Sequence, residues 1–157
     1  MTLLVAYASK RGSTKEVAEA LVERLRRDGQ EAEVRSAADV DDLAPYEGVV
    51  LGGSFYVGRW HDDAVGFLTR HWRELSKRPV WAFGLGPKTS EEDDLAAARS
   101  QLEKVLRKMA QVEARSVAVF GGVINPSKLR FPMNRMPASD ARDWEAIRSW
   151  ADEIAAA

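Results

Sequence analysis

The chain has 157 residues, of which 45% are hydrophobic and 30% charged, and this length predicts a single domain over residues 1–157. Because 23 Lys and Arg residues nearly balance 24 Asp and Glu residues, the net charge of −1 argues against a nucleic-acid partner. The absence of cysteine excludes disulfides and thiolate chemistry and favours a cytoplasmic location, and no apolar run has the length expected of an integral membrane segment.

Four short apolar runs predict the central strands of a sheet. They lack the alternation of a half-buried strand, so they are typical of strands that a parallel sheet buries on both faces. The runs are residues 3–8, 48–52, 80–83 and 117–120. A fifth segment, residues 31–35, alternates charged with apolar side chains and predicts an edge strand.

Four helices are predicted between and after these strands, because apolar side chains recur there at helical spacing. The apolar stripes are Val17, Leu21 and Leu25; Val65, Leu68, Trp72 and Leu75; Leu95, Leu102, Val105, Leu106 and Met109; and Trp144, Ile147, Ala151 and Ile154.

Polar residues and glycine mark the expected helix boundaries. Ser13 to Glu16 and Ser90 to Asp93 fit the capping-box pattern, and Asp140 is the expected N-cap of the last helix. Asp28-Gly29 is the expected end of the first helix.

Strands that alternate with helices in about 150 residues predict an α/β fold with right-handed crossovers. Five strands suit a doubly wound parallel sheet of the flavodoxin-like order 2-1-3-4-5, enclosed by helices in a three-layer sandwich. In such a sheet, ligands bind beyond the carboxyl ends of the strands, where the winding reverses. The loops after residues 8, 52 and 83 therefore form the candidate site.

The loop after the first strand, Ser9-Lys10-Arg11-Gly12-Ser13-Thr14, predicts a phosphate-binding turn. Gly12 permits a tight turn, and the N–H groups of the first helical turn point outward among hydroxyls and a guanidinium. The P-loop and dinucleotide-binding glycine patterns are both absent here, so the ligand would be a mononucleotide-type phosphate. The alternative is that Ser13 only caps the helix and that Lys10 and Arg11 are solvated charges.

Two further loops have the composition expected around a flat heteroaromatic ring. The segment after the third strand combines glycine with aromatic side chains, and the one after the fourth is expected to expose backbone N–H and C=O groups. The candidate ring-binding residues are Ser54, Phe55, Tyr56, Val57, Gly58, Gly84, Leu85 and Gly86. The alternatives are that Phe55 and Trp60 belong to the core beneath a turn, and that the later glycines only connect a strand to a helix.

Ser9, Gly12 and Thr14 stand in register with the flavodoxin phosphate signature T/S-x-T-G-x-T, in which Arg11 replaces a hydroxyl residue. With the two later loops, these residues make the chain resemble the flavodoxin-like, FMN-binding family over nearly its whole length. The resemblance implies FMN as the cofactor. It also implies that the first loop holds the phosphate and that the two later loops clasp the isoalloxazine ring.

Within that family, residues 53–58, His61 and the closing Asp143-Trp144-Glu145 resemble the menaquinone-dependent protoporphyrinogen oxidase branch, whose members carry a longer insertion after the fifth strand. This resemblance implies an FMN-dependent oxidoreductase that passes electrons between an organic substrate and a quinone or protein acceptor. The alternatives are a flavodoxin-type electron-transfer protein, whose partner would be a redox protein, and a degenerate module that no longer binds flavin. The net charge of −1 favours the enzyme, because freely diffusing carriers usually present an acidic face.

Residues 116–139 contain no acidic side chain, and Lys128, Arg130 and Arg135 are interleaved there with apolar ones. The segment from Lys128 to Arg135 is a candidate for peripheral contact with anionic lipid or an amphiphilic anion, and the alternative is a solvated loop packed on the last helix. His61 is expected to cap the second helix rather than relay protons. No catalytic side chain and no metal ligand is predicted.

Overall fold

The computed structural model describes residues 2–9, 12–56, 59–86, 92–124 and 138–157. Its central sheet is parallel and has the order β2-β1-β3-β5-β6, which is the predicted 2-1-3-4-5 order when the five parallel strands are counted alone. These strands are β1 (Thr2–Ala8), β2 (Glu31–Ser36), β3 (Gly48–Tyr56), β5 (Val80–Leu85) and β6 (Ala114–Phe120). The short strand β4 (Arg59–Trp60) folds back antiparallel on the end of β3.

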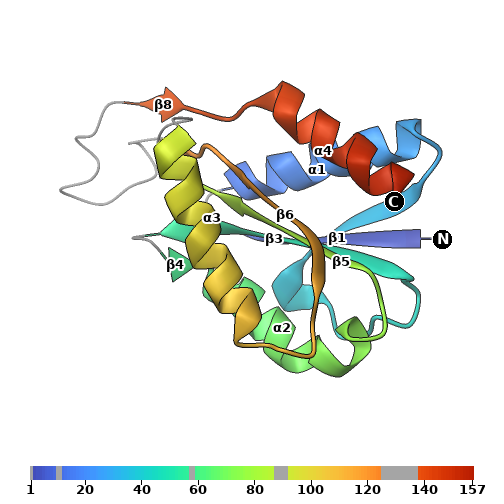
Figure 1. Cartoon of the computed structure of the whole chain (residues 1–157). Coiled ribbons are helices and arrows are strands. Elements are labelled where there is room, and N and C mark those ends of the chain that lie inside the picture. The colour runs from blue at the N-terminus through green and yellow to red at the C-terminus, as the bar shows by residue number, and fades with distance from the viewer. Residues whose placement is uncertain (1, 10–11, 57–58, 87–91, 125–137) are drawn as a thin grey trace.

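Two helices cover each face of the sheet, which confirms the three-layer sandwich (Figure 1). Helices α1 (Ser13–Arg27) and α4 (Trp144–Ala156) pack on one face, and α2 (Asp62–Leu75) and α3 (Glu92–Arg107) on the other. Successive side chains of a strand point to opposite faces, so β1 supplies Leu3 and Val5 to the first core and Leu4 and Ala6 to the second. All four side chains are fully buried.

The last predicted strand in the chain is less buried than expected. Residues 117–120 were expected to be buried on both faces, but β6 pairs only with β5 among the described strands, and most of its side chains are half-exposed. Apolar composition alone does not reveal that a strand is the last of its sheet. Four short elements were also missed. They are the 3-10 helix η1 (Ala37–Asp39), strand β4, and the strands β7 (Val123–Ile124) and β8 (Ser139–Asp140), which pair with each other.

The helix boundaries are partly as predicted. Asp28 is the C-cap of α1 and Gly29 has a φ of 86°, so the expected end of that helix is confirmed. The N-cap of α4 is Asp143, whose side chain accepts a hydrogen bond from the Ala146 N–H, so the prediction of Asp140 is wrong by three residues. Ser90 lies outside the described residues. No helix in the described part of the chain combines the length and the apolar character needed to cross a bilayer.

Candidate functional site

The three predicted loops begin at neighbouring positions of the sheet. The strand registers place Ala8 beside Gly53, Gly53 beside Gly84, and Ser54 beside Leu85. The carboxyl ends of β1, β3 and β5 therefore lie side by side at one end of the strands, where the winding of the sheet reverses. Residues that are about 30 to 75 positions apart in sequence are thus brought to one place.

The turn that leaves β1 is held by its own polar groups. The Ser9 hydroxyl accepts a hydrogen bond from the Gly12 N–H at 2.9 Å, and Gly12 adopts a left-handed conformation with a φ of 85°. A side chain is strained at this φ, so the tight turn requires glycine. The Ser9 hydroxyl proton can still be donated to another acceptor.

Helix α1 begins with N–H groups that no side chain caps. Gly12 is its N-cap and has no side chain with which to cap the helix, and the first intrahelical bond runs from the Glu16 N–H to the Gly12 carbonyl. The N–H groups of residues 13–15 have no intrahelical acceptor, as in any first turn. The Thr14 hydroxyl is fully buried there and has no hydrogen-bond partner. This combination suits an anion, because a negative acceptor satisfies all these donors and interacts favourably with the helix dipole.

The predicted capping box at Ser13 and Glu16 is wrong. Ser13 is the first residue inside the helix rather than its N-cap, because the chain turns sharply at Gly12. The Glu16 side chain is 62% exposed, and its carboxylate lies 3.6 Å from the Arg142 guanidinium. The sequence pattern therefore marked the correct helix start but assigned the cap one residue too late.

The aromatic side chains of Phe55, at the end of β3, and Trp60, in β4, fill space instead of leaving an open slot. Trp60 is 3% exposed, and its indole Nε1 donates to the carbonyls of Gly53 and Phe83 at 3.0 and 3.3 Å. Phe55 is half-buried and lies over Gly84, where an added Cβ would come within 2.3 Å of the ring. The alternative that Trp60 belongs to the core is therefore confirmed. Phe55 is only partly buried against the core, where its ring packs on Gly84.

The backbone at the end of β5 is less available for hydrogen bonding to a ligand than expected. Gly84, Leu85 and Gly86 are all buried, and the Gly86 N–H already donates to the Phe120 carbonyl at 2.9 Å. The expectation of an exposed N–H at Gly86 is therefore wrong. The Leu85 side chain belongs to the core beneath α1 and α4, so only its backbone faces the candidate site.

Several predicted residues fall in the gaps between the described ranges. Lys10, Arg11, Val57 and Gly58 lie outside the described residues, as does the basic segment from Lys128 to Arg135. Tyr56 is described through its backbone, which pairs with Arg59 in the β3–β4 hairpin.

His61 caps helix α2, as predicted. Its Nδ1 accepts a hydrogen bond from the Asp63 N–H at 3.0 Å, so the neutral ring carries its proton on Nε2. That Nε2 is buried and has no partner.

Sequence reasoning missed Arg142, which lies between β8 and α4. Its side chain is only 9% exposed, and it donates to the carbonyl of Ser13 in the first turn of α1. It also makes a bidentate ion pair with Asp140, with a shortest distance of 2.7 Å, and its hydrogen bonds hold the pKa of that carboxyl below its usual range. No periodicity or motif marks such a residue, because its contact with α1 spans 129 positions.

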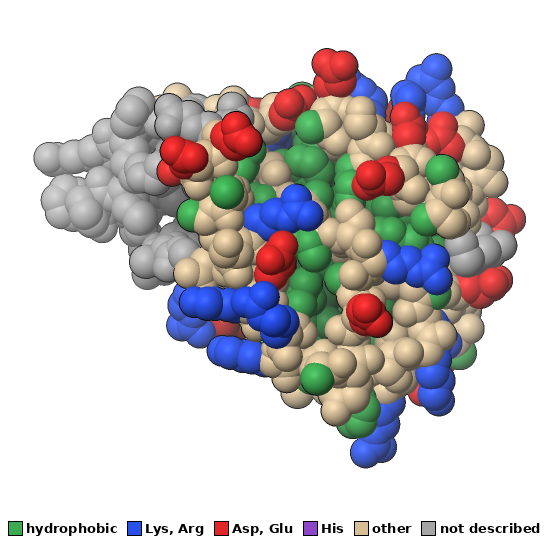
Figure 2. Space-filling model, viewed as in Figure 1, with side chains coloured by type: hydrophobic (Ala, Val, Ile, Leu, Met, Phe, Trp, Pro, Cys, Tyr) green, Lys and Arg blue, Asp and Glu red, His purple; other side chains and the backbone are tan. Residues whose placement is uncertain are grey.

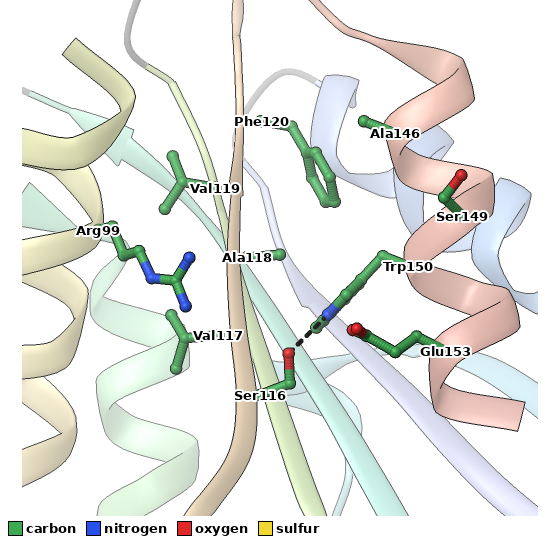
Figure 3. A pocket seen from close by; sticks show the side chains of 10 residues that line it. All are labelled: Arg99, Ser116, Val117, Ala118, Val119, Phe120, Ala146, Ser149, Trp150 and Glu153. Atoms are coloured by element: carbon green, nitrogen blue, oxygen red, sulfur yellow. Dashed lines mark hydrogen bonds between the residues drawn. The ribbon is translucent and has the colours of Figure 1, made fainter. Parts of the chain in front are cut away.

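A hollow of about 440 Å³ lies elsewhere, along the β6 edge between α3 and α4 (Figure 3). Arg99 borders it on one side, and Trp150 and Glu153 border it on the other. The Trp150 indole donates to the Ser116 hydroxyl at 3.0 Å. None of the predicted site residues lines this hollow, so it is separate from the three loops.

A doubly wound sheet of this order, with an anion-suited turn after its first strand, defines a flavodoxin-like α/β protein. A family model described as a flavodoxin domain matches residues 4–136. The chain therefore belongs to the flavodoxin domain family. The family identifies FMN as the cofactor, as predicted from the sequence.

Individual relatives agree with this assignment. A protein of Escherichia coli strain K12 named protoporphyrinogen IX dehydrogenase (quinone) is 22% identical over 172 residues, which cover 99% of this chain and 95% of the relative. Oxidised flavodoxin 2 from Bacillus cereus superposes with a TM-score of 0.66 at 21% identity, and an archaeal flavodoxin with 0.65 at 17%. Both alignments cover 99% of this chain and 97% of the other. At such identities the structural likeness shows the fold.

Proposed function

We propose that this chain is an FMN-dependent oxidoreductase whose flavin phosphate binds at the turn between β1 and α1. The observation that carries the proposal is the fully buried, unpartnered Thr14 hydroxyl in the first turn of α1. A buried hydroxyl without a partner costs about 1–3 kcal/mol, which a bound phosphate oxygen would offset. The Ser9 hydroxyl lies at the same turn, where it accepts the Gly12 N–H, and hydroxyls together with first-turn N–H groups fit a phosphate ester.

The other predicted residues receive roles that follow from their positions. Lys10, Arg11 and Ser13 complete the phosphate loop, and residues 54–58 are proposed to cover one side of the ring. Gly84, Leu85 and Gly86 border the ring through backbone atoms, in particular carbonyl oxygens, because the Gly86 N–H is already engaged. Bound FMN supplies the electron transfer. The protein supplies a dry, oriented site for the cofactor, and the buried Trp60 and half-buried Phe55 keep the floor beneath it rigid.

The proposed substrate class comes from the E. coli relative, whose name assigns it protoporphyrinogen IX and a quinone. The charge distribution agrees with an enzyme rather than an acidic carrier. The net charge is −1, and Figure 2 shows acidic and basic side chains interspersed on the face that it displays. A carrier that relies on electrostatic steering toward basic partners would gain from a face of one sign.

The competing function is electron transfer between proteins, which the flavodoxin structural neighbours favour. Two measurements separate the possibilities. First, flavin-free protein is titrated with FMN and with riboflavin, and quenching of flavin fluorescence gives both dissociation constants. We expect FMN to bind more tightly by at least about tenfold, since a hydrogen-bonded charged group contributes about 1.5–3 kcal/mol.

Second, the FMN-loaded protein is mixed anaerobically with protoporphyrinogen IX and a soluble quinone, and porphyrin fluorescence is followed. Turnover that depends on both reactants supports the oxidoreductase. Reduction by a flavodoxin reductase without porphyrin formation supports the carrier. A protein that binds neither flavin contradicts both functions.

A further inference from the structure

Arg142 connects the C-terminal part of the chain to the proposed phosphate turn. One Nη atom, Nη1, lies 3.4 Å from the Ser13 carbonyl oxygen and 3.6 Å from a Glu16 carboxylate oxygen. The opposite side of the guanidinium is fixed by Asp140, and the guanidinium carbon lies over the Trp144 ring, 4.7 Å from its centroid. Arg142 thus has one well-defined orientation, which points at the first turn of α1.

The segment that carries Arg142 is itself anchored. Strands β7 and β8 pair, and the Ala141 N–H donates to the Gly122 carbonyl at 2.9 Å. Gly121 packs so closely on Ala141 that an added Cβ would lie 2.3 Å from the Ala141 oxygen. The guanidinium is therefore held against α1 by the chain that follows β6, at the carboxyl edge of the sheet.

The charges around Arg142 determine what it can do. Asp140 and Glu16 supply two carboxylates to one guanidinium, so Arg142 has little net charge to offer a phosphate directly. Glu16, however, stands in the first turn of α1, where an unpaired carboxylate repels an incoming dianion. Arg142 draws this carboxylate into an ion pair and at the same time fixes the Ser13 carbonyl.

We propose that Arg142 is a positioning residue for the flavin phosphate, which holds the first turn of α1 and offsets part of the Glu16 charge so that the turn accepts a dianion. The proposal rests on the proposed FMN site. It concerns only the phosphate end of the ligand, and it therefore predicts no effect on a flavin that lacks the phosphate.

The test uses full-length, flavin-free protein and the ratio of the riboflavin to the FMN dissociation constant. In Arg142→Gln we expect this ratio to fall at least about tenfold through weaker FMN binding, while the dissociation constant for riboflavin stays within about twofold. Arg142→Lys keeps the charge but loses the planar fork, so an intermediate ratio is expected. The control is Arg99→Gln, which removes a guanidinium paired with Glu103 on α3 at 3.2 Å and leaves the ratio unchanged.

A second substitution distinguishes electrostatic positioning from a general loss of structure. Arg142→Gln leaves the Asp140 and Glu16 carboxylates without their guanidinium. Adding Glu16→Gln removes the one that stands in the first turn of α1, so part of the lost FMN affinity should return. The melting temperature of each flavin-free variant is recorded in parallel.

The results separate the two proposals. If the wild type prefers FMN but the Arg142 variants keep the same preference, or lose riboflavin and FMN affinity equally, the role of Arg142 is refuted and the phosphate site stands. If the wild type binds FMN and riboflavin equally well, the proposed phosphate site fails and the role of Arg142 fails with it.

Discussion

The two ends of helix α1 satisfy their polar groups in opposite ways. At the C-terminal end, the N–H groups of residues 28–30 bond back to carbonyls of the last turn, Gly29 has a φ of 86°, and Arg24 donates to Asp152 at 2.7 Å. At the N-terminal end, Gly12 has nearly the same φ of 85°, but the Thr14 hydroxyl is buried without a partner.

This difference separates stability from function within one element. The C-terminal end is a complete helix stop that fixes α1 to α4. The N-terminal end keeps the Thr14 hydroxyl unsatisfied at a cost to the flavin-free protein, and such a group is expected where a ligand completes the structure. Substitutions at the two ends should therefore have separable effects on folding and on flavin binding.

The largest effect is expected for Thr14→Val, which removes the unpartnered hydroxyl and keeps the side-chain shape. FMN affinity should fall about 10- to 100-fold, because a hydrogen bond to a charged group is lost. The flavin-free protein should unfold no more easily than the wild type, since the hydroxyl contributes no bond there. Fluorescence titration and urea unfolding measure the two quantities.

Thr69→Val is the matched control for this substitution. Thr69 is exposed on α2, and its hydroxyl donates to the Val65 carbonyl, so neither FMN affinity nor stability should change beyond a few tenths of a kcal/mol. A drop in stability of the Thr14 variant equal to its loss of binding energy would contradict the comparison.

The two left-handed glycines allow the ends to be compared with the same substitution. Gly12→Ala and Gly29→Ala place a methyl group at almost the same φ, and neither meets an atom within 4 Å. Each should lower the free energy of unfolding by about 1–2 kcal/mol, the cost of a side chain in this conformation. Only Gly12→Ala should also weaken FMN binding. Equal FMN affinities in the two variants would show that the turn at Gly12 is not part of the site.

What could be predicted from the sequence follows the same division. The Asp28-Gly29 stop and the apolar stripes of the helices are local patterns, and the structure confirms them. The cap at Ser13 was misassigned because Gly12 turns the chain one residue earlier. Gly12 adopts a left-handed conformation, which the neighbouring residues in the sequence do not specify. Arg142 was missed because its contact with Ser13 joins residues 129 positions apart. Likewise, the engagement of the Gly86 N–H by Phe120 depends on the sheet register.

A smaller effect is expected from an anion that has no ring. If the N-terminal end binds inorganic phosphate with a dissociation constant of about 10 mM, then about 50 mM phosphate stabilises the flavin-free protein by about 1 kcal/mol. The melting temperature should rise by about 2–4 °C over sodium chloride of equal ionic strength, as measured by differential scanning fluorimetry. Thr14→Val should show a smaller rise. An equal rise in that variant would place the anion elsewhere.

The smallest effect concerns acid stability at the C-terminal end. Hydrogen bonds from Arg24, and from the neighbouring Asp28, lower the pKa of Asp152 to about 2. A carboxyl whose pKa is depressed on folding stabilises the protein above its unfolded value near 3.8, and this contribution is lost as the pH falls from about 4 to about 2. The pKa of Asp28 is raised by its hydrogen bond to Asp152, which gives the opposite trend above about pH 4. Stability is therefore compared below that pH.

Asp152→Asn should lose stability less steeply than the wild type between about pH 4 and pH 2 in urea unfolding, because the asparagine does not titrate. Asp152 contacts the end of α1 opposite the proposed phosphate site, so the FMN affinity of Asp152→Asn at neutral pH should match the wild type. A change in this affinity would mean that the two ends of the helix are coupled.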